Sequence, residues 1–81
     1  METKKKDDRK LLGSQIEDRI LEYIKEKPLE VGDRLPNEFE LAEMFEVGRS
    51  TIREAVKGLV TKGVLQVRRG AGTYVSSLTP A

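Results

Sequence analysis

Three basic residues recur at four-residue intervals in the second half of the chain: Arg49, Arg53 and Lys57. On a helix, this spacing places them in one stripe. An arginine guanidinium is a fixed fork of donors that suits phosphate or the O6 and N7 edge of guanine, whereas lysine is a point charge. Ser50 and Thr51 would lie in the first turn, where unpaired backbone N–H groups favour phosphate. The stripe therefore predicts binding of a polyanion.

A second basic pair, Arg68 and Arg69, directly precedes the glycine-rich sequence 70–72. Segments 64–68 and 73–76 are rich in β-branched residues, so they predict a β-hairpin with its turn at the glycines. A tip at Gly70 can approach a sugar–phosphate backbone closely, and Arg69 beside it can enter a narrow minor groove. An ordinary hairpin with solubilising surface arginines is the alternative interpretation.

Apolar periodicity predicts three helices that would position these side chains. The first follows residue 11, with Ser14 and Glu17 fitting a capping box, and ends near Lys27 before Pro28. The second begins at the N-cap Asn37 and runs about two and a half turns, and the third covers about 49–62. Residues 28–36 predict a structured loop in which 34–35 add a short strand.

The second and third helices are separated by only three or four residues, which is typical of a helix-turn-helix. In that motif, the N-terminal residues of the second helix read bases in the major groove of DNA. Arg49 and Arg53 are then the predicted base readers, and Lys57 is a predicted phosphate contact. A solvated cationic helix face, partly neutralised by Glu54, would explain the same stripe.

Composition excludes several other classes of function. With 81 residues the chain forms one domain, and it has no Cys and no His. We therefore expect no disulfides, no metal site, no cofactor and no enzymatic activity. The acidic residues of the second helix predict a solvated face. These residues are Glu38, Glu40, Glu43 and Glu46. No signal peptide or membrane span is visible, so we expect a cytoplasmic protein without a membrane partner.

Charge is distributed unevenly although the net charge is only +1. Residues 1–10 carry +2 and predict a flexible charged arm, residues 11–46 carry −6, and residues 47–81 carry +5. Segment 77–81 reads as the start of a linker. The halves could pair their charges, or the acidic half could dock a basic protein. The alternative function is therefore a winged-helix protein–protein interaction module.

Residues 35–75, LPNEFELAEMFEVGRSTIREAVKGLVTKGVLQVRRGAGTYV, resemble the N-terminal winged helix-turn-helix domain of the GntR family of bacterial transcription regulators. The resemblance covers about residues 11–76, and the sequence at 53–56 looks most like the FadR-type branch. It implies an α+β, mainly helical fold of three helices and a C-terminal β-hairpin wing. Two positions depart from the family. Phe39 stands where the family commonly has a DNA-contacting Arg, and Gly48 where it usually has Ser or Thr.

The resemblance implies sequence-specific binding of double-stranded operator DNA by a metabolite-responsive regulator, a repressor, acting as a homodimer on a palindromic operator. It implies DNA contacts from one set of residues: Asn37, Arg49, Ser50, Thr51, Arg53, Lys57, Arg69 and Gly70. Family members also carry a C-terminal domain that binds a small-molecule effector. Such a domain is absent from these 81 residues.

Overall fold

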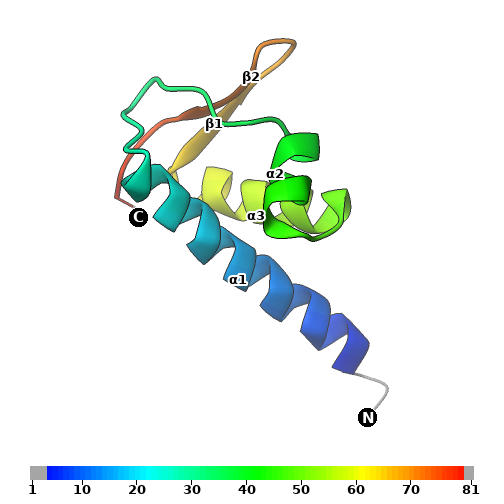
Figure 1. Cartoon of the computed structure of the whole chain (residues 1–81). Coiled ribbons are helices and arrows are strands. Elements are labelled where there is room, and N and C mark those ends of the chain that lie inside the picture. The colour runs from blue at the N-terminus through cyan, green and yellow to red at the C-terminus, as the bar shows by residue number, and fades with distance from the viewer. Residues whose placement is uncertain (1–3, 80–81) are drawn as a thin grey trace.

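The computed structural model describes residues 4–79, and describes side chains from Leu12 onward. Three helices precede an antiparallel hairpin: α1 (Lys4–Glu26), α2 (Glu38–Phe45), α3 (Arg49–Thr61), β1 (Leu65–Arg68) and β2 (Gly72–Val75). In Figure 1, α1 runs along one side of the molecule and the hairpin projects from the other. Helix α3 packs against α1, α2 and β1 and so forms the centre of the fold. The predicted fold class is confirmed.

Helix α1 begins at Lys4, so the expected flexible arm over residues 1–10 is wrong for residues 4–10, and residues 1–3 lie outside the described part. Ser14 is a mid-helix residue and not the predicted N-cap. Residues 4–12 contain no Gly or Pro, and Asp7 precedes Lys10 by three residues, a favourable helical spacing. Once the packed part of a helix exists, adding residues at its end requires no new nucleation.

The core is a layer of apolar, mostly aliphatic side chains between α1 and the rest of the molecule. Ile16, Ile20 and Ile24 recur every four residues on α1 and are fully or almost fully buried. The opposing side chains come from every other element; they are Leu35, Leu41, Phe45, Ile52, Ala55, Leu59, Val64, Leu65 and Val75. Each buried aliphatic side chain of this size stabilises the fold by about 1.5–3 kcal/mol through removal from water.

Arg19 of α1 fixes the end of α2. Its Nη1 donates to the carbonyl of Phe45 at 3.3 Å, and its guanidinium lies 4.7 Å from the centre of the Phe45 ring. A cation at a helix C-terminus is favourable because the last carbonyls there lack partners. The chain then turns at Glu46, which is left-handed at φ 57°, and α3 begins after Gly48.

The loop between α1 and α2 holds the base of the hairpin. Leu35 N–H donates to the Thr73 carbonyl, Gly32 N–H donates to the Val75 carbonyl and Val75 N–H donates to the Asp33 carbonyl, each at 2.8 Å. Arg34 pairs with Tyr74 as an isolated antiparallel bridge, which confirms the predicted short strand at 34–35 as a single-residue contact. Strand β2 is therefore hydrogen-bonded on both of its edges, to β1 and to this loop, whereas the hairpin tip extends beyond the loop.

An ion pair joins α1 to the end of α3. Lys62 Nζ donates to Glu17 Oε1 at 2.7 Å, and this contact raises the pKa of the Lys62 ammonium. The Glu17 carboxylate crosses α3 at Gly58, where a Cβ atom would overlap it. Gly58 thus leaves room for the Glu17 carboxylate over α3. In the predicted linker, Ser77 N–H still donates to the Val64 carbonyl at 3.1 Å.

Candidate nucleic-acid interface

The predicted basic stripe lies on the exposed side of α3. Arg49, Arg53 and Lys57 are all exposed, while the opposite side of the helix buries Ile52 and Ala55 in the core. This division follows from the helical repeat of the sequence. The stripe is therefore presented to solvent by the same helix that organises the core.

The first turn of α3 is open to an anion. Gly48 is the N-cap and offers no side chain to accept from the free backbone N–H groups. Ser50 is exposed and Thr51 is half-buried, so the Ser50 hydroxyl is the more accessible of the two. This arrangement suits a phosphate oxygen, which would accept from backbone N–H groups at the positive end of the helix.

The first turn of α2 holds both arginines of the stripe, and it does so in two different ways. Arg53 Nη2 donates to Glu38 Oε1 at 3.2 Å, so its guanidinium is bound through an edge. The Arg49 guanidinium carbon lies over the Phe39 ring, 4.4 Å from the ring centre, which is a cation–π contact. Adjacent residues of α2 thus set the directions of two arginines that are one turn apart on α3.

Asn37 has a structural role at the start of α2. Its Oδ1 accepts from Glu40 N–H at 2.9 Å, and Glu40 Oε1 accepts from Asn37 N–H at 2.8 Å, which is a complete capping box. The predicted N-cap is confirmed. Asn37 remains exposed, so its contact with DNA stays a prediction.

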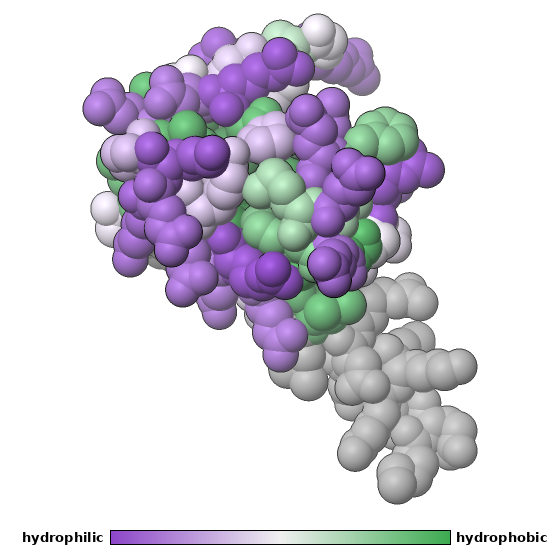
Figure 2. Space-filling model, viewed as in Figure 1, coloured by the Kyte–Doolittle hydropathy of each residue, from purple (hydrophilic) through white to green (hydrophobic). Residues whose placement is uncertain are grey.

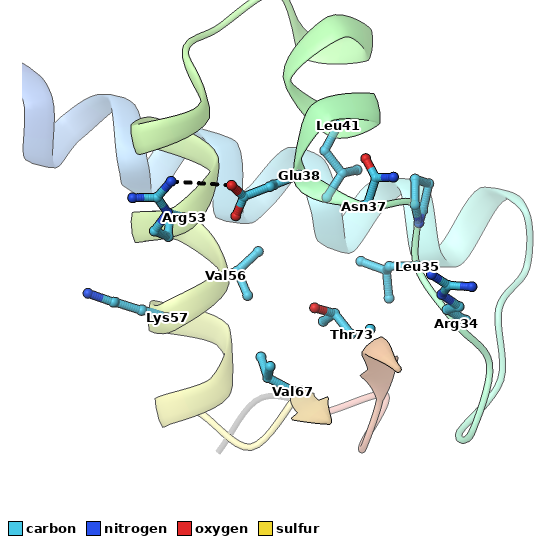
Figure 3. Close-up of a pocket in the computed structure, with 12 residues that line it drawn as sticks. Arg34, Leu35, Asn37, Glu38, Leu41, Arg53, Val56, Lys57, Val67 and Thr73 are labelled. Carbon is cyan, nitrogen blue, oxygen red and sulfur yellow. Dashed lines mark hydrogen bonds and ion pairs between the residues drawn. The ribbon is translucent and has the colours of Figure 1, made fainter. Parts of the chain in front are cut away.

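A groove of about 390 Å³ separates α3 from the hairpin. Figure 3 shows Leu35, Val56 and Val67 directed into it, while Lys57 and Arg34 extend away from it on opposite sides. The groove is thus apolar inside and cationic at its edges. It also brings Arg53 and Lys57 of the basic stripe and residues of both hairpin strands together along one surface.

The hairpin tip consists of residues 69–71, between the paired residues Arg68 and Gly72. The Arg68 guanidinium lies 4.6 Å from the centre of the Tyr74 ring on the opposite strand. Arg69 and Gly70 are exposed, and Gly70 has φ 73° with open space around it. The turn therefore requires glycine at this position for its backbone conformation, as predicted for a narrow tip.

The surface in the view of Figure 2 is mostly hydrophilic, with smaller hydrophobic patches between charged side chains. On α2, Glu40, Glu43 and Glu46 are exposed, consistent with the predicted solvated face. No group of acidic residues within the described part of the chain is arranged to hold a metal ion. No helix among residues 4–79 is long and apolar enough to cross a membrane.

Comparison with known proteins decides the family. The family described as bacterial regulatory proteins, gntR family, matches residues 12–75. The chain belongs to the GntR family. Over 64 residues this GntR domain is 47% identical to the Uxu operon transcriptional regulator of Escherichia coli (strain K12), an alignment that covers 79% of the chain and 23% of that protein. The chain therefore spans about a quarter of the length of such relatives.

Solved structures agree with this GntR assignment. The Streptococcus agalactiae GntR structure is 57% identical with a TM-score of 0.76, over 80% of this chain and 32% of that one. A crystal structure of AraR(DBD) in complex with operator ORX1 is 34% identical with a TM-score of 0.73, over 79% of this chain and 77% of that one. The winged helix-turn-helix fold implied by the sequence resemblance is confirmed.

Sequence reasoning missed the residues that position the basic stripe. Glu38 was interpreted as part of a solvated acidic face, although its carboxylate binds Arg53. Phe39 was identified as a departure from the family, but its contact with the Arg49 guanidinium was not predicted. Arg34, whose guanidinium packs over Gly72, was not considered as part of the interface. The short turn between α2 and α3 brings the end of α2 close to the start of α3, so it gives no signal for contacts made by the first turn of α2.

Proposed function

We propose that this GntR domain binds double-stranded DNA in a sequence-specific manner, as the operator-binding part of a bacterial transcription repressor. The observation that carries the proposal is that Arg53 and Lys57 of α3 and the hairpin strands border one groove. A duplex presents a major groove, a phosphate backbone and a minor groove in that order across its surface. The domain offers α3, an apolar groove with cationic edges and a glycine tip in the same order.

In this arrangement the exposed side of α3 enters the major groove, whose width of about 12 Å admits a helix. Arg49 and Arg53 contact base edges, and Ser50, Thr51 and the free N–H groups of the first turn contact phosphate. The start of α2, including Asn37, lies against the backbone. Lys57 meets phosphate one turn further along α3.

The backbone between the two grooves then crosses the space between α3 and the hairpin. Arg69 and Gly70 reach toward the minor groove, where negative potential attracts arginine. The apolar interior of the groove offers a surface for deoxyribose, and Arg34 lies at its far edge. Each contact thus has a residue of suitable chemistry on the one surface.

The whole regulator is proposed to act as a homodimer on a palindromic operator, with a small-molecule effector bound by another domain. Support comes from the family and from relatives about four times longer than this chain. When two domains bind two half-sites, each supplies part of the binding free energy, so a single domain is expected to bind weakly.

The test is fluorescence anisotropy of a labelled mixed-sequence duplex titrated with the chain at several salt concentrations. Each neutralised phosphate contributes about −0.9 to the slope of log affinity against log salt. Three neutralised phosphates therefore predict a slope of about −2.7 and an affinity loss of about 40-fold between 50 and 200 mM salt. Lys57→Ala should reduce the slope by about 0.9.

Lys25→Ala removes the same charge at the exposed end of α1 and serves as the matched control. Its slope should equal that of the wild type. Absence of binding at low salt by a folded sample would contradict the proposal. Capture of a basic protein by the acidic half under the same conditions would favour the alternative, an interaction module.

A further inference from the structure

Phe39 is an aromatic residue on the surface that faces DNA in the proposed function. Its exposed fraction is 62%, larger than that of any other exposed large apolar residue in the described chain. Because the Phe39 side chain is mostly exposed, packing in the core does not explain why a phenylalanine occupies this position. Its ring lies 4.4 Å from the Arg49 guanidinium, at the first residue of α3.

Stacking and hydrogen bonding use different parts of a guanidinium. The guanidinium carbon of Arg49 lies over the Phe39 ring, 4.4 Å from its centre, whereas hydrogen bonds to a base would come from the five N–H donors of the guanidinium. The fork of Arg49 can therefore bind the O6 and N7 atoms of a guanine without leaving the ring. Arg53 differs because the carboxylate of Glu38 already accepts from its Nη2.

We propose that Phe39 is a positioning residue that orders Arg49 for base reading, so that base preference at the position read by Arg49 depends on Phe39. This inference rests on the proposed DNA-binding function. The stacked ring restricts the rotamers of a long side chain before DNA arrives, which lowers the entropy lost on binding. An exposed cation–π contact corresponds to about a two- to fivefold change in equilibrium constant, which sets the expected effect.

The experiment selects bound sequences from a randomised duplex library with the wild-type chain and with Phe39 variants. Phe39→Leu keeps an apolar side chain but removes the ring face, and Phe39→Tyr keeps the ring face. Phe39→Leu should lower the preference about two- to fivefold at the same base pair that Arg49→Ala affects. Phe39→Tyr should restore it. Met44→Ala, at an exposed apolar residue on the same helix, should change nothing.

A second variant pair separates positioning from direct contact. In an Arg49→Ala background, Phe39→Leu should cause no further change in base preference. A further change there, or a change at a different base pair, would show that Phe39 contacts DNA itself and would overturn the inference. Unchanged preference in Phe39→Leu alone would overturn it as well.

A measurement without DNA distinguishes failure of this inference from failure of the proposed function. The Phe39 ring current should shift the Arg49 side-chain NMR signals upfield in the free protein, and Phe39→Leu should abolish that shift while the amide spectrum of the core stays the same. If the shift is present but the wild type selects no sequence, the proposed function fails. If the wild type selects a sequence but Arg49 shows no shift, the positioning role fails.

Discussion

The start of α3 and residues 68–71 at the end of the hairpin each present two arginines to solvent, but they hold them differently. On α3, Arg53 and Arg49 are both bound by the first turn of a separate helix, through Glu38 and Phe39. On the hairpin, the Arg68 guanidinium contacts the ring of Tyr74, which lies on the neighbouring strand of the same sheet. Among residues 12–79, no hydrogen bond or ion pair includes the Arg69 side chain.

This difference indicates two kinds of DNA contact. Reading a base edge requires a donor fork at a fixed place and angle, so preset arginines are suited to the major groove. Following a sugar–phosphate backbone or entering a narrow groove requires adaptation to DNA shape, which an unrestrained arginine on a glycine turn can provide. We expect α3 to determine which sequence is bound and the tip to add affinity.

The largest expected effect of a single change on binding is at Arg53. Arg53→Ala should cost about 1–3 kcal/mol and relax preference at one base pair. Lys57→Ala, one turn further along, should weaken all sequences alike. Affinities of both variants for a selected duplex and for its single-base variants measure this. Equal weakening of all duplexes by Arg53→Ala would mean that Arg53 contacts only phosphate.

The hairpin has two glycines with positive φ, Gly70 within the tip and Gly72 at the start of β2, directly beside the tip. Gly70→Ala must adopt a left-handed backbone at φ 73°, which costs about 1–2 kcal/mol, but it meets open space. Gly72 has φ 124°, and a Cβ there would lie 2.7 Å from Arg34 Nε. Gly72→Ala should therefore destabilise the hairpin more, as measured by hydrogen exchange of the Leu35 and Val75 amides. Equal effects would show that Gly70 in the tip is as constrained as Gly72 beside Arg34.

Arg69→Ala tests the tip directly. It should weaken binding by less than tenfold, or about 1.4 kcal/mol, and reduce the salt slope by about 0.9 without changing base preference in the major-groove positions. Anisotropy titrations over a salt series, with sequence selection at one salt, provide both readouts. A loss of preference at the base pair read by Arg53 would contradict the division between the two regions.

Glu38→Gln should produce the smallest change in DNA binding. Affinity for unrelated duplexes should rise, whereas discrimination between base pairs should fall. The Glu38–Arg53 pair is partly exposed, so it contributes only about 0.2–1 kcal/mol. Removing the carboxylate lowers repulsion of phosphate and should raise affinity for unrelated duplexes. Releasing Arg53 should lower discrimination at its base pair. If discrimination rises instead, the carboxylate competes with the base and does not position Arg53.

Local patterns in the sequence predict most of the fold. Helix α3 and the hairpin follow from apolar periodicity and from glycines at turn positions, which act over a few residues. The start of α1 was misplaced because Ser14 and Glu17 match a capping box that also occurs inside a helix. A short local motif cannot distinguish a helix start from a helix interior when the preceding residues are themselves compatible with a helix.

The candidate site was predictable in its charged residues but not in their partners. Arg49, Arg53 and Arg69 stand out by type and spacing alone. Their positions relative to Glu38, Phe39 and Tyr74 depend on how α2 meets α3 and on the register of the hairpin. Arg19 illustrates the same limit, since its contact with Phe45 joins residues 26 positions apart.

The most direct test is an NMR titration of the isotope-labelled chain with a mixed-sequence duplex at low and moderate salt. Amide shifts confined to residues 48–57 and 68–73, decreasing as salt rises, are the predicted result, and they would be detected even for weak binding by a single domain. Shifts confined to α1 and the acidic face of α2, or no shifts at low salt in a folded sample, would contradict the assignment of α3 and the hairpin tip as the DNA-binding surface.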